Sequence, residues 1–132
     1  MAFPLGNKPL PGYPQPSGEK YQVIFDHPGP ASYTQLTAGT TPTGGDKISA
    51  SGGGLNFGGF DKVDGGYDST GQISASVIPL GSGYGNATPS VIVKYVSLVT
   101  ATLGGQAQTA GSEIAATTNL STFSWRMQAI AV

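Results

Sequence analysis

The chain contains no cysteine, and this absence removes several kinds of chemistry at once. Disulfide bridges, thiolate nucleophiles and cysteine-ligated metal sites are excluded, and the sequence carries no mark of an oxidising compartment. Charge is also scarce, because only 10% of the residues are Asp, Glu, Lys or Arg and the formal net charge is −1. A surface with so few cations gives no electrostatic reason to bind nucleic acid or an anionic membrane. We expect neither as a partner.

Long apolar runs are missing as well. No stretch approaches the roughly 18 apolar residues of a membrane span, and the start, MAFPLGNKPLPGYPQP, lacks the apolar segment of a signal peptide. We therefore expect a soluble protein that is made in a cytoplasm.

Glycine and proline, in contrast, are abundant, with 21 and 10 copies among 132 residues. They interrupt almost every window in which a helix could form, so we expect almost no helix. Short runs rich in Val, Ile, Thr, Tyr and Phe alternate with turn residues. This pattern predicts an all-β fold: a single antiparallel β-sandwich, jelly-roll-like, or a barrel, over residues 20 to 132.

Two strand predictions have the clearest patterns. Residues 90 to 102 crowd β-branched side chains together, which predicts a central strand buried on both faces. Residues 121 to 132 alternate, with Phe123, Trp125 and Met127 on the apolar side. Weaker patterns predict strands at residues 21 to 26, 32 to 37, 47 to 50, 57 to 63 and 72 to 80. Residues 104 to 118 are predicted to form a polar loop with a short extended piece at 113 to 116.

Residues 1 to 19 form a separate Pro-rich segment, which we predict to be an extended N-terminal arm rather than a folded element. It carries the apolar side chains Phe3, Leu5, Leu10 and Tyr13, whose exposure to water would be unfavourable. Two alternatives remain open: a flexible terminus, or an arm that docks against its own domain or a neighbour. In the second case these four side chains are the interaction residues.

The one histidine, His27, follows Asp26 directly. Adjacent strand residues point to opposite faces, so Asp26 cannot orient the imidazole as a catalytic triad requires. A metal site with one histidine and no cysteine is equally poorly supported. We interpret His27 as a residue that ends a strand at a turn. The only glutamates, Glu19 and Glu113, lie at the edge of the arm and in a polar loop, a setting that does not favour a glycosidase pair.

The densest acidic group is Asp61, Asp64 and Asp68. Their spacing does not match an EF-hand loop, whereas Asp followed by Gly or Ser is common in hairpin turns. We predict turns here, with a bound cation as the alternative. The glycine clusters at 52 to 54, 58 to 59 and 81 to 85 are predicted to be turns, because no helix follows them to complete a nucleotide site. We expect no cofactor.

The aromatic residues Tyr95, Phe123 and Trp125 allow two interpretations. They could form a platform on which a sugar stacks, as in β-sandwich lectins, or they could belong to the hydrophobic core. Because Phe123 and Trp125 lie on the apolar side of an alternating strand, the core is the favoured interpretation.

Three segments carry a family resemblance: YQVIFDHPGPASYTQLTAG at 21 to 39, TPTGGDKI at 41 to 48, and SEIAATTNLS with the alternating strand that follows it, at 112 to 132. With these segments the chain resembles the small structural proteins of tailed bacteriophages, in particular capsid cement or decoration proteins. The resemblance covers most of residues 20 to 132. It implies a non-enzymatic subunit on the capsid surface of a virion, made in the host cytoplasm, that oligomerises and clamps neighbouring major capsid subunits.

The low charge and the sheet edges of a β-domain favour a dimer or trimer. The alternatives are a tail, neck or head-fibre component of a virion, or a carbohydrate-binding module.

Overall fold

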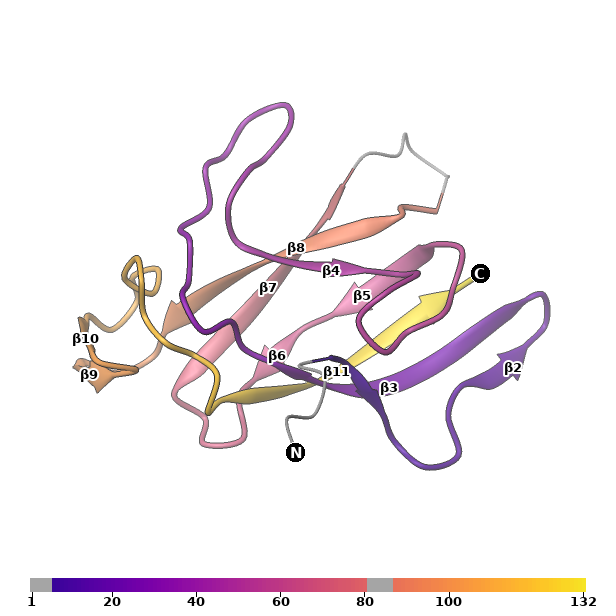
Figure 1. Cartoon of the computed structure of the whole chain (residues 1–132), viewed down its shortest axis with the longest axis horizontal. Coiled ribbons are helices and arrows are strands. Elements are labelled where there is room, and N and C mark those ends of the chain that lie inside the picture. Colours follow the sequence, from indigo (N-terminus) through magenta and orange to yellow (C-terminus); the bar gives the residue numbers. More distant parts are fainter. Residues whose placement is uncertain (1–5, 81–86) are drawn as a thin grey trace.

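The computed structural model describes residues 6 to 80 and 87 to 132, and in this part of the chain all regular structure is β-strand (Figure 1). One sheet has the order β1-β3-β11-β5, with β2 also paired to β3, and a second has the order β4-β8-β7-β6. The two antiparallel sheets form a sandwich-like fold and do not close into a barrel, which confirms the predicted all-β class. The strands are β1 (Lys8–Pro9), β2 (Gln15–Ser17), β3 (Lys20–Pro28), β4 (Asp46–Ser49), β5 (Phe60–Asp64), β6 (Gly66–Tyr67), β7 (Ile73–Leu80), β8 (Ser90–Ser97), β9 (Ala101–Leu103), β10 (Gln106–Gln108) and β11 (Ser124–Ala131).

Within the described ranges, no helix is long and apolar enough to cross a membrane.

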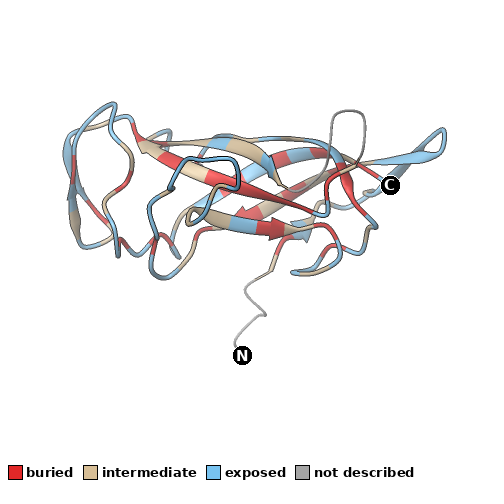
Figure 2. Cartoon of the chain, turned by 90° about the horizontal axis from the view of Figure 1, so that it is seen from above, coloured by how far each residue is buried: buried red, intermediate tan, exposed pale blue. Residues whose placement is uncertain are grey.

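Strands β3 and β11 form the centre of the first sheet and lie side by side (Figure 1). Burial alternates along both strands, as the sequence predicted for residues 121 to 132. The register pairs buried residues with each other, namely Val23 with Ala129, Phe25 with Met127 and His27 with Trp125. The buried positions of both sheets face one shared core, while the loops at the two ends of the molecule are largely exposed (Figure 2).

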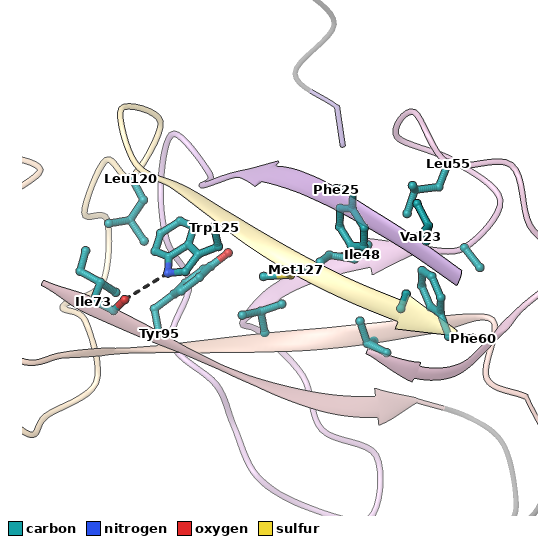
Figure 3. Close-up of a cluster of buried hydrophobic side chains, with 14 of the residues drawn as sticks. Val23, Phe25, Ile48, Leu55, Phe60, Ile73, Tyr95, Leu120, Trp125 and Met127 are labelled. Carbon is teal, nitrogen blue, oxygen red and sulfur yellow. Dashed lines mark hydrogen bonds between the residues drawn. The ribbon is translucent and has the colours of Figure 1, made fainter. Parts of the chain in front are cut away.

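Trp125 belongs to that core, where it lies close to Tyr95 and Ile73 (Figure 3). Its side chain is fully buried, its ring centroid lies 4.3 Å from that of Tyr95, and its indole N–H donates to the Ile73 carbonyl at 3.1 Å. Phe123 is half-buried, with its ring 6.5 Å from that of Trp125. The core interpretation of these three aromatic residues is therefore confirmed.

The N-terminal arm is part of the first sheet, so the expectation that it is not a folded element is wrong for its described residues. Both β1 and β2 pair with β3, at residues 25 to 26 and 20 to 22 respectively, and together they cover the outer edge of that strand. Pro9 and Pro16 lie within these short strands. A proline is tolerated there because an edge strand can spare the missing N–H.

The chain changes from one sheet to the other at Gly65. β5 pairs with β11 in the first sheet, whereas β6 pairs with β7 in the second. A Cβ atom on Gly65 would lie 2.3 Å from the Ala75 carbonyl oxygen, so no other residue fits without a shift of the backbone. The hairpin turn expected at residues 64 to 66 is thus wrong, since these residues form a corner between the sheets.

Three other predicted segments need correction. The strand predicted at 90 to 102 ends at Ser97, whose hydroxyl accepts from the Val99 N–H and donates to the Val99 carbonyl. Such local bonds compete with a strand ladder. No strand forms at residues 32 to 37, because Tyr33 exchanges backbone hydrogen bonds with the loop at Thr117 and Thr118 instead. The predicted loop at 104 to 118 contains β10, which forms a hairpin with β9.

Candidate functional site

The single histidine joins the arm to both sheets. His27 is buried near the end of β3, where its Nδ1 lies 2.5 Å from Asn7 Oδ1 and its Nε2 lies 2.6 Å from Asp46 Oδ2. Asn7 directly precedes β1, and Asp46 opens β4 in the second sheet. The prediction that His27 lies at the end of a strand is confirmed, but its interpretation as a simple turn residue missed this link.

Asp46 has a second partner in the same network. The Tyr95 hydroxyl donates to Asp46 Oδ2 at 2.6 Å. Burial, and then the nearby Asp46 carboxylate, raise the pKa of Tyr95 above its ordinary value, so this hydroxyl keeps its proton and remains a donor. The Asn7–His27–Asp46–Tyr95 chain, which we call the arm lock, thereby connects the arm, β3, β4 and β8.

A second buried tyrosine holds Glu113. The Tyr33 hydroxyl donates to Glu113 Oε2 at 2.7 Å, and the Leu36 N–H donates to the same oxygen at 2.7 Å. Burial and the Glu113 hydrogen bond raise the pKa of Tyr33. Glu113 therefore ties the loop at 33 to 36 to the loop that follows β10. Glu19 is exposed between β2 and β3, so the two glutamates do not come together.

A hollow of about 290 Å³ opens beside the arm lock, lined by Asn7, His27, Asp46, Ser49 and the glycines at 52 and 53. His27 has no free ring nitrogen to offer to a molecule in this hollow, because one nitrogen is hydrogen-bonded to Asn7 and the other to Asp46. A general base needs a nitrogen that faces the proton to be removed. The arm lock is therefore suited to holding strands together. Sequence reasoning could not find it, since Asn7 and Asp46 lie 20 and 19 residues from His27.

The three clustered aspartates serve different purposes. Asp61 and Asp64 lie at exposed positions of strand β5, where they pair with Lys20 and Lys62 respectively, so the turn prediction is wrong for both. Asp68 is buried and forms the predicted turn: its carboxylate accepts the backbone N–H groups of Thr70, Gln72 and Ile73 at 2.8 to 3.0 Å. In residues 6 to 80 and 87 to 132, no three His, Asp or Glu side chains gather to hold a metal ion.

This turn predicts a specific pH dependence. Burial opposes the ionisation of Asp68, but the hydrogen bonds from Thr70, Ile73 and Gln72 outweigh it and hold the pKa of Asp68 below the ordinary value of 3.8. The carboxylate therefore stabilises the fold at neutral pH, and this stabilisation is lost as the pH falls below 3.8 through the folded-state pKa. We expect Asp68→Asn to lower the free energy of unfolding by about 1 to 2 kcal/mol at pH 7.

Urea titrations at pH 7 and pH 3 test this prediction. The difference between wild type and Asp68→Asn should shrink at the lower pH. Asp64→Asn is the matched control, because Asp64 is an exposed carboxylate paired only with Lys62 at the surface. An equal loss in both variants would contradict the role of the turn.

Two of the four predicted interaction residues of the arm lie in the described part of the chain. Leu10 and Tyr13 are half-buried, the Leu10 N–H donates to the Ile24 carbonyl, and Tyr13 packs against the core of the same domain. Phe3 and Leu5 lie outside the described residues. The glycine cluster at 81 to 85 also lies outside them, whereas Gly53 and Gly54 have positive φ angles, as a turn requires.

The arm also borders an apolar hollow of about 420 Å³. We call it the arm hollow and define it by Pro9, Pro14, Tyr21, Phe57 and Val132. The Tyr21 side chain is 42% exposed and its ring centroid lies 5.9 Å from that of Phe57. Aromatic rings beside prolines form a stiff surface that loses little conformational entropy when a partner covers it.

Comparison with known proteins gives no family assignment. No protein-family model matches the chain, and no curated protein or solved structure matches it.

Proposed function

We propose that this protein is a non-enzymatic structural subunit of a virion, a capsid cement or decoration protein that attaches to major capsid subunits through the arm hollow. The observation that carries the proposal is the arm itself. It is paired along β3, held by the arm lock, and bordered by an apolar surface that contains two prolines, the exposed Tyr21 ring and the half-buried Phe57 ring.

The arm lock supports the non-enzymatic part of the proposal. Histidine is the side chain that most often serves as a general base, but here His27 joins strands, and both of its ring nitrogens are hydrogen-bonded. The low charge supports the rest, because charged residues are depleted at the centres of protein interfaces whereas aromatic residues are enriched there.

Attachment should depend on Tyr21. We expect Tyr21→Ala to weaken binding to capsids by about tenfold or more, because it removes the largest exposed side chain of the arm hollow. Tyr67→Ala is the matched control, since it also removes an exposed tyrosine, from β6 rather than from the arm side. Capsid shells assembled from the major capsid protein of the proposed virion would be mixed with each variant, and the occupancy of the shells would be measured by sedimentation.

Light scattering on the isolated protein tests the accompanying expectation of a dimer or trimer. A neighbouring portal, protease or major capsid gene would support the virion assignment.

Equal decoration of capsids by Tyr21→Ala and by wild type would contradict the proposed attachment surface. Binding to tail or neck assemblies instead of capsids would move the protein to another part of the virion.

A further inference from the structure

A third hollow lies on the outer face of the first sheet, away from the arm lock. It has a volume of about 350 Å³ and is lined by Asp26, Tyr67, Ser69, Ser124 and Arg126. We call it the Tyr67 hollow. Tyr67 is 66% exposed, the highest value among the exposed large hydrophobic side chains of the described residues. Because Asp68 is buried, the neighbouring Tyr67 points out to solvent.

The floor of the hollow is an ion pair between adjacent strands. Asp26 and Arg126 are register partners in β3 and β11, and Arg126 donates to both carboxylate oxygens, at 3.0 and 3.3 Å. This pairing raises the pKa of Arg126. The pair places a charged acceptor and a charged donor side by side in the lining of the hollow, and its two charges cancel.

The backbone that follows Tyr67 is held by hydrogen bonds to both sheets. The Asp68 N–H donates to the Ile73 carbonyl at 3.0 Å, and the Ser69 N–H donates to the Ser124 carbonyl at 3.2 Å. The Asp68 carboxylate closes the turn that follows. The backbone beside Tyr67 is thus anchored to both sheets through the next two residues, so little backbone entropy is lost when a ligand binds against the ring.

We propose that the Tyr67 hollow is a binding site for a neutral oligosaccharide. A pyranose ring offers an apolar C–H face, which can lie against the Tyr67 ring, and neighbouring hydroxyls that each donate and accept hydrogen bonds. Asp26 and Arg126 supply an acceptor and a donor at adjacent positions, and the Ser69 and Ser124 hydroxyls can do either.

We propose a neutral ligand because the charges of the lining balance: it holds one carboxylate and one guanidinium. Lys8 is the register partner of Asp26 on its other side but does not line the hollow. This site is distinct from the platform that the sequence suggested, because Tyr95 and Trp125 are fully buried. It is also independent of the arm hollow.

The test measures oligosaccharide binding by saturation-transfer NMR and titration calorimetry. The neutral probes are maltotetraose, cellotetraose, mannotetraose and tetra-N-acetylchitotetraose, with a heparin-derived tetrasaccharide as the acidic comparison. We expect at least one neutral probe to bind with a dissociation constant on the order of 1 mM. Tyr67→Ala and Arg126→Gln should each weaken that binding by about tenfold, whereas Tyr67→Phe, which keeps the ring, should retain most of it.

Tyr21→Ala is the control and should bind the probe as wild type does, because Tyr21 does not line the Tyr67 hollow. The test uses no capsid, so its result does not depend on the capsid proposal. Because Tyr67 and Arg126 are exposed, their variants should melt as wild type does, and any loss of binding then reports on the site. The proposal is overturned if no neutral probe binds, if the heparin fragment binds more tightly than all of them, or if Tyr67→Ala binds as well as wild type.

Discussion

Trp125→Ala should destabilise the protein by about 3 to 5 kcal/mol, which is a large part of the stability of a domain of this size. The indole is fully buried, packs against Tyr95 and donates to the Ile73 carbonyl. Its removal leaves a cavity between the two sheets and takes one of two hydrogen bonds from the Ile73 carbonyl, which still accepts from the Asp68 N–H. We expect a melting temperature lower by tens of degrees, or no folded protein at 37 °C, from roughly 4 to 8 °C per kcal/mol for small domains.

Circular dichroism is the appropriate measurement, because Trp125 is the only tryptophan and the variant loses its fluorescence signal. Trp125→Phe serves as the intermediate variant. It keeps an aromatic ring but loses the hydrogen bond, so it should cost less than Trp125→Ala. A melting temperature unchanged in Trp125→Ala would show that the indole is not part of the core.

Asp46→Ala should cost about 2 to 4 kcal/mol, because it removes the shared acceptor of the arm lock. The buried Tyr95 hydroxyl and His27 Nε2 both lose their partner, and a buried polar group without a partner costs most of its desolvation energy. The arm should loosen at the same time, since His27 no longer has a fixed orientation toward Asn7.

Urea unfolding measures the first effect, and hydrogen exchange of the Leu10 amide, which bonds to Ile24, measures the second. Lys47→Ala is the matched control, because Lys47 is the exposed neighbour of Asp46 in β4. Asp46→Asn, which keeps one acceptor oxygen, should lose less stability than Asp46→Ala. Equal stability of Asp46→Ala and Lys47→Ala would contradict the structural role of the arm lock.

Local pattern was sufficient for the strands whose side chains alternate or crowd together. The alternation at residues 121 to 132 predicted β11 and the burial of Trp125 and Met127. The β-branched run at 90 to 102 predicted a strand buried on both faces, which forms over residues 90 to 97. These features follow from the two-residue period of a strand, which is visible within a few residues. The scarcity of helix follows from the glycines and prolines in the same local way.

Predictions failed where a short segment is held by a distant partner. Residues 32 to 37 have strand-like composition, yet Tyr33 bonds to residues 117 and 118 and no ladder forms. For the arm, the sequence leaves open whether it is a flexible terminus or is docked, because prolines indicate an extended backbone but not what lies beside it. Its pairing with β3 depends on which sheet edge is open, which only the assembled sheet decides.

Composition, strand period and turn residues thus determined the all-β class, the central strands and the core aromatic residues of this chain. The tertiary structure alone decided the arm lock and the Tyr67 hollow. His27 meets Asp46 across the two sheets, and Asp26 meets Arg126 from a position 100 residues away. Such pairs arise from sheet order and register, and these depend on contacts between segments that the sequence places far apart.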